Sequence, residues 1–350
     1  MKNSAFSDPT PLQSDLTLLR GVSRSFYLSI RLLPRALRAP IAAGYLLARA
    51  TDTVADTTDL PQTERLVLLH TLLSAIESPT GDLSDAAAQL AAFARLQTDP
   101  YEQALMCALP QCLRLLQNLS AADQASVRWV LRPIAQGQIK DVERFGQGLQ
   151  ALNTEQELTD YTWQVAGCVG EFWTELCERH LPSFATLSPA SMRLTGSRYG
   201  MGLQRLNILR DAGADLAAGR CYLPQDRLAL LGLSPAQLAQ AVAAGDGVTL
   251  ARVKPLYNAY LDLTQAHLLD GLHYSCALQS RRLRVASALP ALIGTRTLAL
   301  LRQAGPSAWQ QRIKVPRHEI RALLWRLMWR GGSPVALAQE FGRLSAPPAT

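Results

Sequence analysis

Two pairs of aspartates are the residues of this sequence most suited to chemistry, because both pairs have the spacing Asp-x-x-x-Asp. Asp52 and Asp56 form the first pair, and Asp211 and Asp215 form the second. On a helix, residues four apart lie one turn apart on the same face, so each pair predicts two neighbouring carboxylates. Mg²⁺ is usually held by a few carboxylates together with phosphate oxygens. The spacing therefore favours a site for Mg²⁺ and a diphosphate.

Polar residues continue both predicted helix faces. They are Tyr45 and Arg49 before the first pair and Gln204 and Asn207 before the second, and Arg210 neighbours the second face. Arginine binds phosphate oxygens through parallel, charge-assisted hydrogen bonds. If the diphosphate is a leaving group, metal and arginine stabilise the charge that develops as its C–O bond breaks.

The alternative is that each pair lies on a solvated helix face and binds nothing. Both pairs, however, are embedded in apolar segments, where unpaired charge is costly. The flanking apolar residues of the first pair are Leu46, Leu47, Ala48, Ala50 and Val54. Two such segments in one chain favour the metal site, and facing helices of a bundle could bring the two pairs together.

The elements that must position these residues are helices. Apolar residues recur at helical spacing, as in Leu66, Leu69, Leu72, Leu73 and Ile76 and again in Ile320, Leu323, Leu324 and Leu327, whereas strand-like alternation is scarce. We expect an all-α fold with one domain over residues 14–343 and loose tails at 1–13 and 344–350. In the uncharged run 228–245, Ser234 and Pro235 predict the start of a helix and not a membrane span.

The net charge and the cysteines restrict the possible partners and compartment, but they do not identify a function. The 350 residues include 35 Lys and Arg against 28 Asp and Glu, a net charge of +7 that suits an anionic partner. No helix-turn-helix, zinc or aromatic-interleaved basic motif supports nucleic acid as that partner. The six cysteines form no CxxC pair, and the N-terminus has no signal-peptide core, so we expect a cytoplasmic protein without disulfides.

Longer motifs around the aspartates resemble the squalene and phytoene synthases. They begin at Ser23-Arg24-Ser-Phe26 and continue through Tyr45 to Asp56, Tyr161 to Gly170, Gln204 to Asp215, and Gly219-Arg220-Cys-Tyr222-Leu-Pro224. The motifs follow the family's order over roughly residues 20–330. Ala55, Thr57 and Ala214 depart from it, since acids are usual there in some members.

The resemblance implies an isoprenoid-synthase helical bundle around a central apolar cavity, and a prenyltransferase that joins two prenyl diphosphates head to head. It implies that Asp52, Asp56, Asp211 and Asp215 bind Mg²⁺ and that Tyr161 assists ionisation or proton removal. Residues matching the family's diphosphate sites are Ser23, Arg24, Phe26, Tyr45, Arg49, Gln204, Asn207, Arg210, Arg220 and Tyr222.

The resemblance also suggests a product. The segment Arg49 to Asp56 is more similar to squalene synthases, which use NADPH to reduce presqualene diphosphate made from two farnesyl diphosphates. Tyr222-Leu-Pro is shared with phytoene synthases, so a non-reductive dehydrosqualene or phytoene synthase is the alternative. Lys314 and Arg317 lie where squalene synthases place segments near the cofactor. We expect a monomer that contacts the inner face of the membrane from time to time.

Other classes remain open: a nucleic-acid-binding protein, suggested by net charge alone, and a helical scaffold without activity. Two further clusters are assigned structural roles. Arg281, Arg282 and Arg284 are interpreted as a solvated helix end, with a clamp for a cofactor phosphate or an approach to anionic lipid as the alternative. Trp325 and Trp329 are interpreted as core or lid packing.

Overall fold

The protein is all-α, as expected. The computed structural model describes residue 30 and residues 33–346, except 81, 147, 312, 330 and 331. Within these residues, strand is limited to β1 (Gln150–Ala151) and β2 (Arg220–Cys221), which pair in parallel. Ser23, Arg24 and Phe26 lie outside the described residues. The described chain divides into two compact units between Ile139 and Lys140.

The first unit is built around α3 (Arg35–Asp56), which packs against α4, α6 and α7. Leu37, Ile41, Leu46 and Leu47 of α3 are fully or almost fully buried there. The other elements are α4 (Gln62–Glu77), η1 (Ser84–Ala86), α5 (Ala87–Leu96), α6 (Pro100–Cys107) and α7 (Leu109–Gln117), followed by α8 (Ala121–Arg144), whose last residues belong to the second unit.

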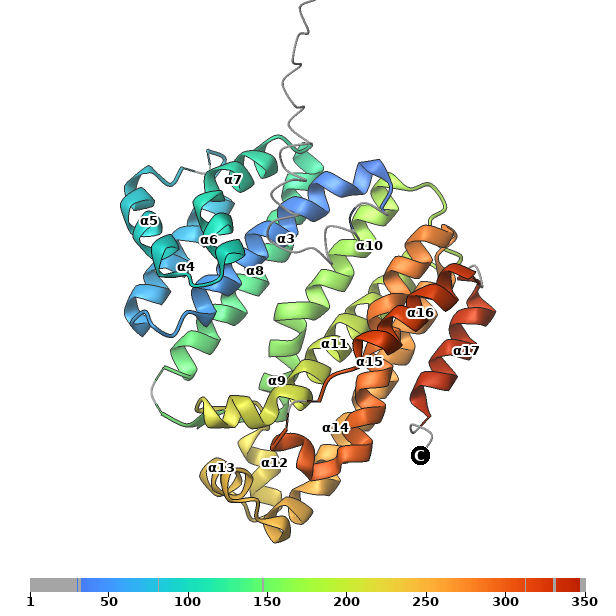
Figure 1. Cartoon of the computed structure of the whole chain (residues 1–350). Coiled ribbons are helices and arrows are strands. Elements are labelled where there is room, and N and C mark those ends of the chain that lie inside the picture. Colours follow the sequence, from blue (N-terminus) through green and yellow to red (C-terminus); the bar gives the residue numbers. More distant parts are fainter. Residues whose placement is uncertain are drawn as a thin grey trace, which may run out of the picture. The chain divides into compact units, whose positions relative to one another are not determined.

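The second unit is centred on α11 (Pro189–Ala217), which packs against α10, α14 and α15. Figure 1 shows α14 and α15 as long neighbouring helices, with α16 and α17 beside them. The remaining elements are α9 (Glu155–Thr162), η2 (Trp163–Gly167), α10 (Cys168–His180), α12 (Gln225–Leu230), α13 (Pro235–Ala244), α14 (Gly247–Ala277), α15 (Arg281–Ala304), η3 (Gly305–Trp309), α16 (Arg317–Trp329) and α17 (Pro334–Ser345).

Local sequence explains where these helices begin. The predicted start at Ser234 and Pro235 is confirmed: Ser234 caps α13 and forms a capping box with Gln237. Side chains of Ser188, Asp246, Ser280 and Ser333 cap α11, α14, α15 and α17 in a similar way. The predicted apolar faces are also present, since Leu69, Leu72 and Ile76 of α4 are buried.

Glycines let the helices of the second unit approach α11 closely. A Cβ atom at Gly170 would lie 2.0 Å from the carbonyl oxygen of Gly196, and one at Gly200 would lie 2.2 Å from that of Ala166. No side chain fits at either contact. The η2–α10 segment is therefore fixed directly against the helix that carries Asp211 and Asp215.

Two structural interpretations of the sequence are wrong in part, although Arg281 and Arg282 are exposed as expected. Trp325 and Trp329 are not core residues, because they are 59% and 78% exposed on α16. Arg284 is not a solvated helix end, because its guanidinium donates to the carbonyls of Leu278 and Gly332. It therefore ties the start of α15 to the turn that precedes α17.

One helix among the described residues, α15, is long and apolar enough to cross a membrane, and half of that stretch is buried inside the fold. Burial of this kind is common for a core helix. All six cysteines are free thiols.

Candidate functional site

The first aspartate motif lies at the C-terminal end of α3. Tyr45 and Arg49 lie on the same helix, and Arg49 donates to the Asp52 carboxylate. Asp52 is half-buried and Asp56, the last residue of the helix, is exposed. The predicted sharing of one helix face by Arg49 and Asp52 is confirmed by this contact.

Two residues that sequence reasoning missed also belong to the first motif. Glu102 of α6 accepts a hydrogen bond from Arg49 at 2.5 Å, and Gln138 of α8 donates to Asp52. Burial raises the pKa of Asp52, and Arg49 and Gln138 oppose that rise. Burial alone would lower the pKa of Arg49, but Asp52 and Glu102 raise it above its ordinary value. Arg49 is thus held between two carboxylates.

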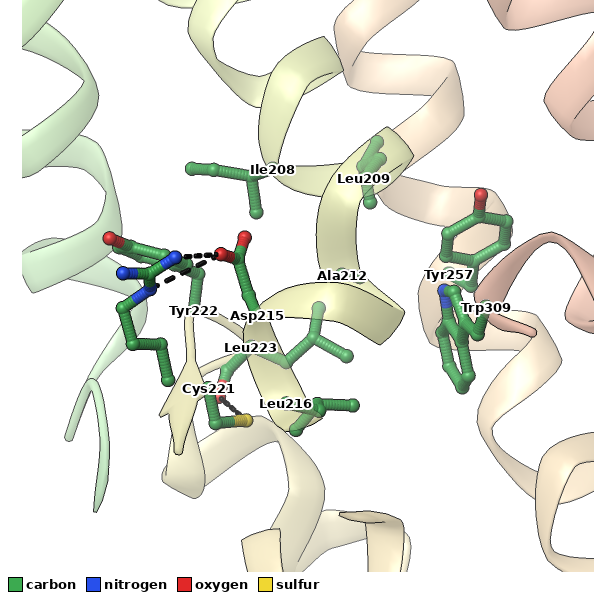
Figure 2. Close-up of a pocket in the computed structure, with 11 residues that line it drawn as sticks. Ile208, Leu209, Ala212, Asp215, Leu216, Cys221, Tyr222, Leu223, Tyr257 and Trp309 are labelled. Atoms are coloured by element: carbon green, nitrogen blue, oxygen red, sulfur yellow. Dashed lines mark hydrogen bonds and ion pairs between the residues drawn. The ribbon is translucent and has the colours of Figure 1, made fainter. Parts of the chain in front are cut away.

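The second motif lies near the C-terminal end of α11. Arg210 donates through two nitrogens to the two oxygens of Asp211, at 2.9 and 2.5 Å. Arg220 of β2 donates to Oδ1 of Asp215 at 3.2 and 2.8 Å, as the dashed lines in Figure 2 show. Burial raises the pKa of Asp215, and Arg220 opposes that rise. Each aspartate of this pair therefore carries an arginine partner.

These four charged residues line one groove of about 520 Å³ in the second unit. Its other wall comes from Trp309, Gln310 and Gln311. A second, small cavity of about 10 Å³ is lined by Asp215 and Arg220 and otherwise mainly by apolar side chains of the core (Figure 2). The groove can accommodate a small anion, with arginines and carboxylates at its base.

A half-buried acid that the sequence did not point to, Asp141 of α8, lies at the centre of a tyrosine cluster. Tyr161 donates to its Oδ2 at 3.0 Å and Tyr222 donates to the same oxygen at 2.5 Å. The rings of Tyr161 and Tyr222 stack with centroids 5.2 Å apart, and Phe145 meets Tyr222 edge-on. We call Asp141, Tyr161 and Tyr222 the tyrosine–aspartate cluster.

Burial raises the pKa of every member of the tyrosine–aspartate cluster. It raises the pKa of Asp141 to about 6, although the hydrogen bonds from both tyrosines and the charge of Arg220 oppose the rise. It raises the pKa of Tyr161 and Tyr222 well above 10, so both remain protonated. A carboxyl group with a pKa near neutrality can accept and release a proton at physiological pH.

Local structure places the cluster next to the second motif. Pairing of β2 with β1 fixes Arg220, and Tyr222 follows directly. Tyr161 is the penultimate residue of α9, which runs directly into η2, a π-helical turn of the kind often found at functional sites. Since η2 is fixed against α11 by Gly167 and Gly200, Tyr161 has a defined position relative to Asp215.

The other predicted site residues are less closely tied to these contacts. Gln204 is half-buried and Asn207 is exposed on α11. Lys314 and Arg317 are exposed, Lys314 in the segment before α16 and Arg317 as its first residue. The structure does not bring them into the ion pairs of the second motif.

The carboxylates suit Mg²⁺ bound together with phosphate. Among the described residues, no group of three or more His, Cys, Asp or Glu side chains is placed to hold a metal ion by itself. Each motif supplies two oxygen-bearing side chains one turn apart, and Mg²⁺ commonly completes its octahedron with phosphate oxygens and water. The donor set therefore fits a metal–diphosphate complex better than a metal centre made by protein alone.

Comparison with known proteins gives a consistent result. Residues 19–319 match the family model described as squalene/phytoene synthase. The chain is 30% identical to a phytoene synthase of Mycobacterium bovis over 220 residues, which is 62% of this chain and 58% of that protein. The match thus spans less than two thirds of that relative's length.

Solved structures share the fold at lower sequence identity. A squalene synthase, TcSQS, in complex with the ligand E5700 has a TM-score of 0.75 at 21% identity, over 96% of this chain and 90% of that one. A dehydrosqualene synthase in complex with a ligand has a TM-score of 0.57 at 21% identity, over 91% and 96% of the two chains. At this level of identity the likeness concerns the fold.

Proposed function

The chain belongs to the squalene/phytoene synthase family, and we propose that it joins two prenyl diphosphates head to head through a cyclopropyl diphosphate. The family makes it a prenyltransferase-type enzyme. The observation that supports the proposal for this chain is the groove of the second motif. Its two arginine–aspartate pairs lie next to the tyrosine–aspartate cluster.

The ion pairs of the groove suggest how a diphosphate is bound. Arg210 and Arg220 are each paired with an aspartate, and arginine pairs equally well with phosphate. We propose that the arginines turn to the diphosphate as Asp211 and Asp215 bind Mg²⁺, so that every charge keeps a partner. Asp52, Asp56 and Arg49 act in the same way at the first motif. When bound, Mg²⁺ neutralises charge that develops on the departing diphosphate.

The tyrosine–aspartate cluster suggests where the reaction's proton goes. Closure of a cyclopropane ring after the two chains join requires loss of a proton from carbon. We propose that the Tyr161 oxygen takes this proton while its own hydroxyl proton passes to Asp141, which is 3.0 Å away. Asp141 is a suitable acceptor because its pKa, raised to about 6, leaves it ionised at neutral pH.

The experiment for this proposal uses purified full chain with farnesyl diphosphate and Mg²⁺, followed by extraction of the products. We expect a C30 product with wild-type protein and about a hundredfold less or lower with Asp52→Asn or Asp211→Asn, while the helical circular dichroism of both variants is unchanged. Unchanged turnover in both variants would show that the metal assignment is wrong.

For the final product, we propose squalene formed with NADPH. The resemblance of residues 49–56 to squalene synthases supports this choice. The non-reductive alternative, dehydrosqualene or phytoene, is supported by the 30% identity to a phytoene synthase. Parallel reactions with and without NADPH, on farnesyl and on geranylgeranyl diphosphate, separate these candidates. Squalene formed only with NADPH supports the first, and the same polyene with and without NADPH supports the second.

Lys314 and Arg317 are proposed to hold NADPH through its phosphates. Both are exposed cations, and they follow shortly after Gln310 and Gln311 of the groove wall. NADPH supplies hydride when it is bound. We expect Lys314→Gln with Arg317→Gln to raise the KM for NADPH and to leave the NADPH-independent step unchanged. A cytoplasmic monomer remains the prediction for location and assembly.

A further inference from the structure

The positive charge of the chain is concentrated at its C-terminal end. Residues 281–350 contain 12 Lys and Arg but only 2 Asp and Glu, whereas residues 1–280 contain 23 and 26. The last 70 residues thus carry a net charge of +10, and the rest of the chain carries −3. The two acids of this end, Glu319 and Glu340, are both paired with arginines. Such asymmetry is typical of a surface that meets a polyanion.

The same end carries the most exposed aromatic pair of the described chain. Helix α16 buries Leu323 and Leu327 on one side and turns His318, Arg321, Trp325 and Trp329 to the other. We call these four residues the tryptophan face. The two indole rings stack on each other with centroids 5.4 Å apart and an interplanar angle of 14°. Two exposed tryptophans on one helix face form an apolar patch that is unusual on a soluble surface.

Further aliphatic and basic residues are exposed on α16 itself and on α15 and α17. Leu324 of α16 and Val335 of α17 are 37% and 67% exposed. Arg281 and Arg282 are exposed at the start of α15, and Arg284 ties that start to Gly332, in the turn between α16 and α17. The patch therefore has a basic residue, Arg321, on its own helix, and two more, Arg281 and Arg282, at the helix start that Arg284 ties to the turn after α16.

We propose that the tryptophan face docks the protein on an anionic lipid bilayer. Tryptophan favours the boundary between headgroups and hydrocarbon, because its ring is apolar and its indole N–H remains hydrated. Basic residues near the surface add attraction to anionic headgroups. Each ring already stacks on the other, and Leu324 is exposed on the same helix, so the patch suits hydrocarbon better than the bases of a nucleic acid. The inference is independent of which product the enzyme makes.

The test is co-sedimentation of the full chain with vesicles of phosphatidylcholine alone and with added phosphatidylglycerol. We expect binding to the anionic vesicles, a blue shift of tryptophan emission, quenching by brominated lipid, and release by high salt. The double variant Trp325→Ser with Trp329→Ser should lose roughly tenfold or more in partitioning. Arg321→Gln should lose about fivefold. The matched control is Leu230→Ser, because Leu230 is 77% exposed on α12, and it should bind as wild type.

Several results would overturn the proposal. They are equal vesicle binding by wild type and the double variant, absence of binding by wild type, and emission changes produced by a single-stranded oligonucleotide instead of lipid. A wild-type dimer that the double variant converts to monomer, without any lipid binding, would assign the face to a second copy. Brominated-lipid quenching is read in wild-type protein, so it remains decisive even if the double variant is unstable.

Discussion

The helices α3 and α11 each carry two aspartates one turn apart, and the partners of these aspartates differ. Asp52 shares Arg49 with Glu102, and its side chain is 39% exposed. Asp215 is 14% exposed and is paired with Arg220, next to the tyrosine–aspartate cluster. In the first motif, two partly exposed carboxylates share one arginine. In the second, the charges of Arg220 and Asp215 act on the half-buried carboxylate of Asp141, the proposed proton acceptor. The two motifs therefore have the same spacing but different surroundings. We expect substitutions in the second motif to lower kcat/KM more than substitutions in the first.

The largest expected effect comes from removing the charge of Asp215. Asp215→Asn should lower kcat/KM about 10³-fold and Asp52→Asn about 10²-fold, the range seen when one charge-stabilising group is lost. The difference arises because Asp215→Asn removes the hydrogen-bonded carboxylate partner of Arg220 next to the tyrosine–aspartate cluster, whereas Glu102 still holds Arg49 in Asp52→Asn. Steady-state kinetics with farnesyl diphosphate measures both.

Asp262→Asn is the matched control, because Asp262 is 69% exposed and paired with Arg302. It should leave kcat/KM unchanged. Equal losses in Asp52→Asn and Asp215→Asn, or a larger loss in Asp52→Asn, would contradict the ranking of the two motifs.

The next effect concerns the proton acceptor. Tyr161→Phe and Asp141→Asn should each lower kcat about 10²-fold with little change in KM, a usual size for a lost proton-transfer group. In wild type, kcat should fall as the pH drops through about 6, because Asp141 then becomes protonated and cannot accept. A pH–rate profile shows whether kcat falls on the acid side. The residual kcat of Asp141→Asn should not fall as the pH drops through about 6.

Tyr257→Phe is the control for the tyrosine substitutions. Tyr257 is buried in the same unit, and its hydroxyl has no hydrogen-bond partner among the described residues. Its substitution should leave kcat unchanged. If Tyr161→Phe keeps the wild-type rate, the relay through Tyr161 is wrong.

A stability effect of opposite sign should accompany the loss of activity. The folded-state pKa of Asp141 is raised to about 6 from 3.8, so stability due to its protonated form is present below pH 4 and is lost as the pH rises through 6. Above pH 6 the ionised Asp141 lowers the free energy of unfolding by about 3 kcal/mol, from roughly two pKa units at 1.36 kcal/mol each. Asp141→Asn should therefore raise Tm at pH 8, and the gain should shrink toward pH 4. A gain that does not depend on pH would contradict this origin.

The smallest expected effect is at the shared arginine of the first motif. Glu102→Gln leaves Arg49 with Asp52, and partly exposed ion pairs contribute little. We expect the KM for farnesyl diphosphate to change by at most about fivefold, with kcat unchanged. A loss as large as that of Asp52→Asn would mean that Glu102 itself is an essential ligand.

Local spacing allowed part of this arrangement to be predicted. The all-α fold, the helical faces around Asp52 and Asp211, and the cap at Ser234 all depend on residues within a few positions of each other. The partners of Asp141 lie 20 and 81 positions away, and Glu102 lies 53 positions from Arg49. No periodic pattern marks such pairs, because only tertiary packing brings them together.

The exposure of Trp325 and Trp329 could not be predicted from the sequence for a related physical reason. Trp325 and Trp329 repeat with the spacing of a buried helix stripe, as do Leu323 and Leu327 on the opposite side of α16. Hydrophobic periodicity identifies a helix with an apolar side. It does not say which of two apolar sides the fold covers.

Condensation of two prenyl diphosphates at the aspartate motifs is tested by the stoichiometry of diphosphate release from farnesyl diphosphate with Mg²⁺ and without NADPH. We expect a cyclopropyl C30 diphosphate as the first product, with one diphosphate released for every two substrates consumed. Asp215→Asn should form both products about 10³-fold more slowly. Release of one diphosphate per substrate with only farnesol as product, unchanged in Asp215→Asn, would contradict condensation at these motifs.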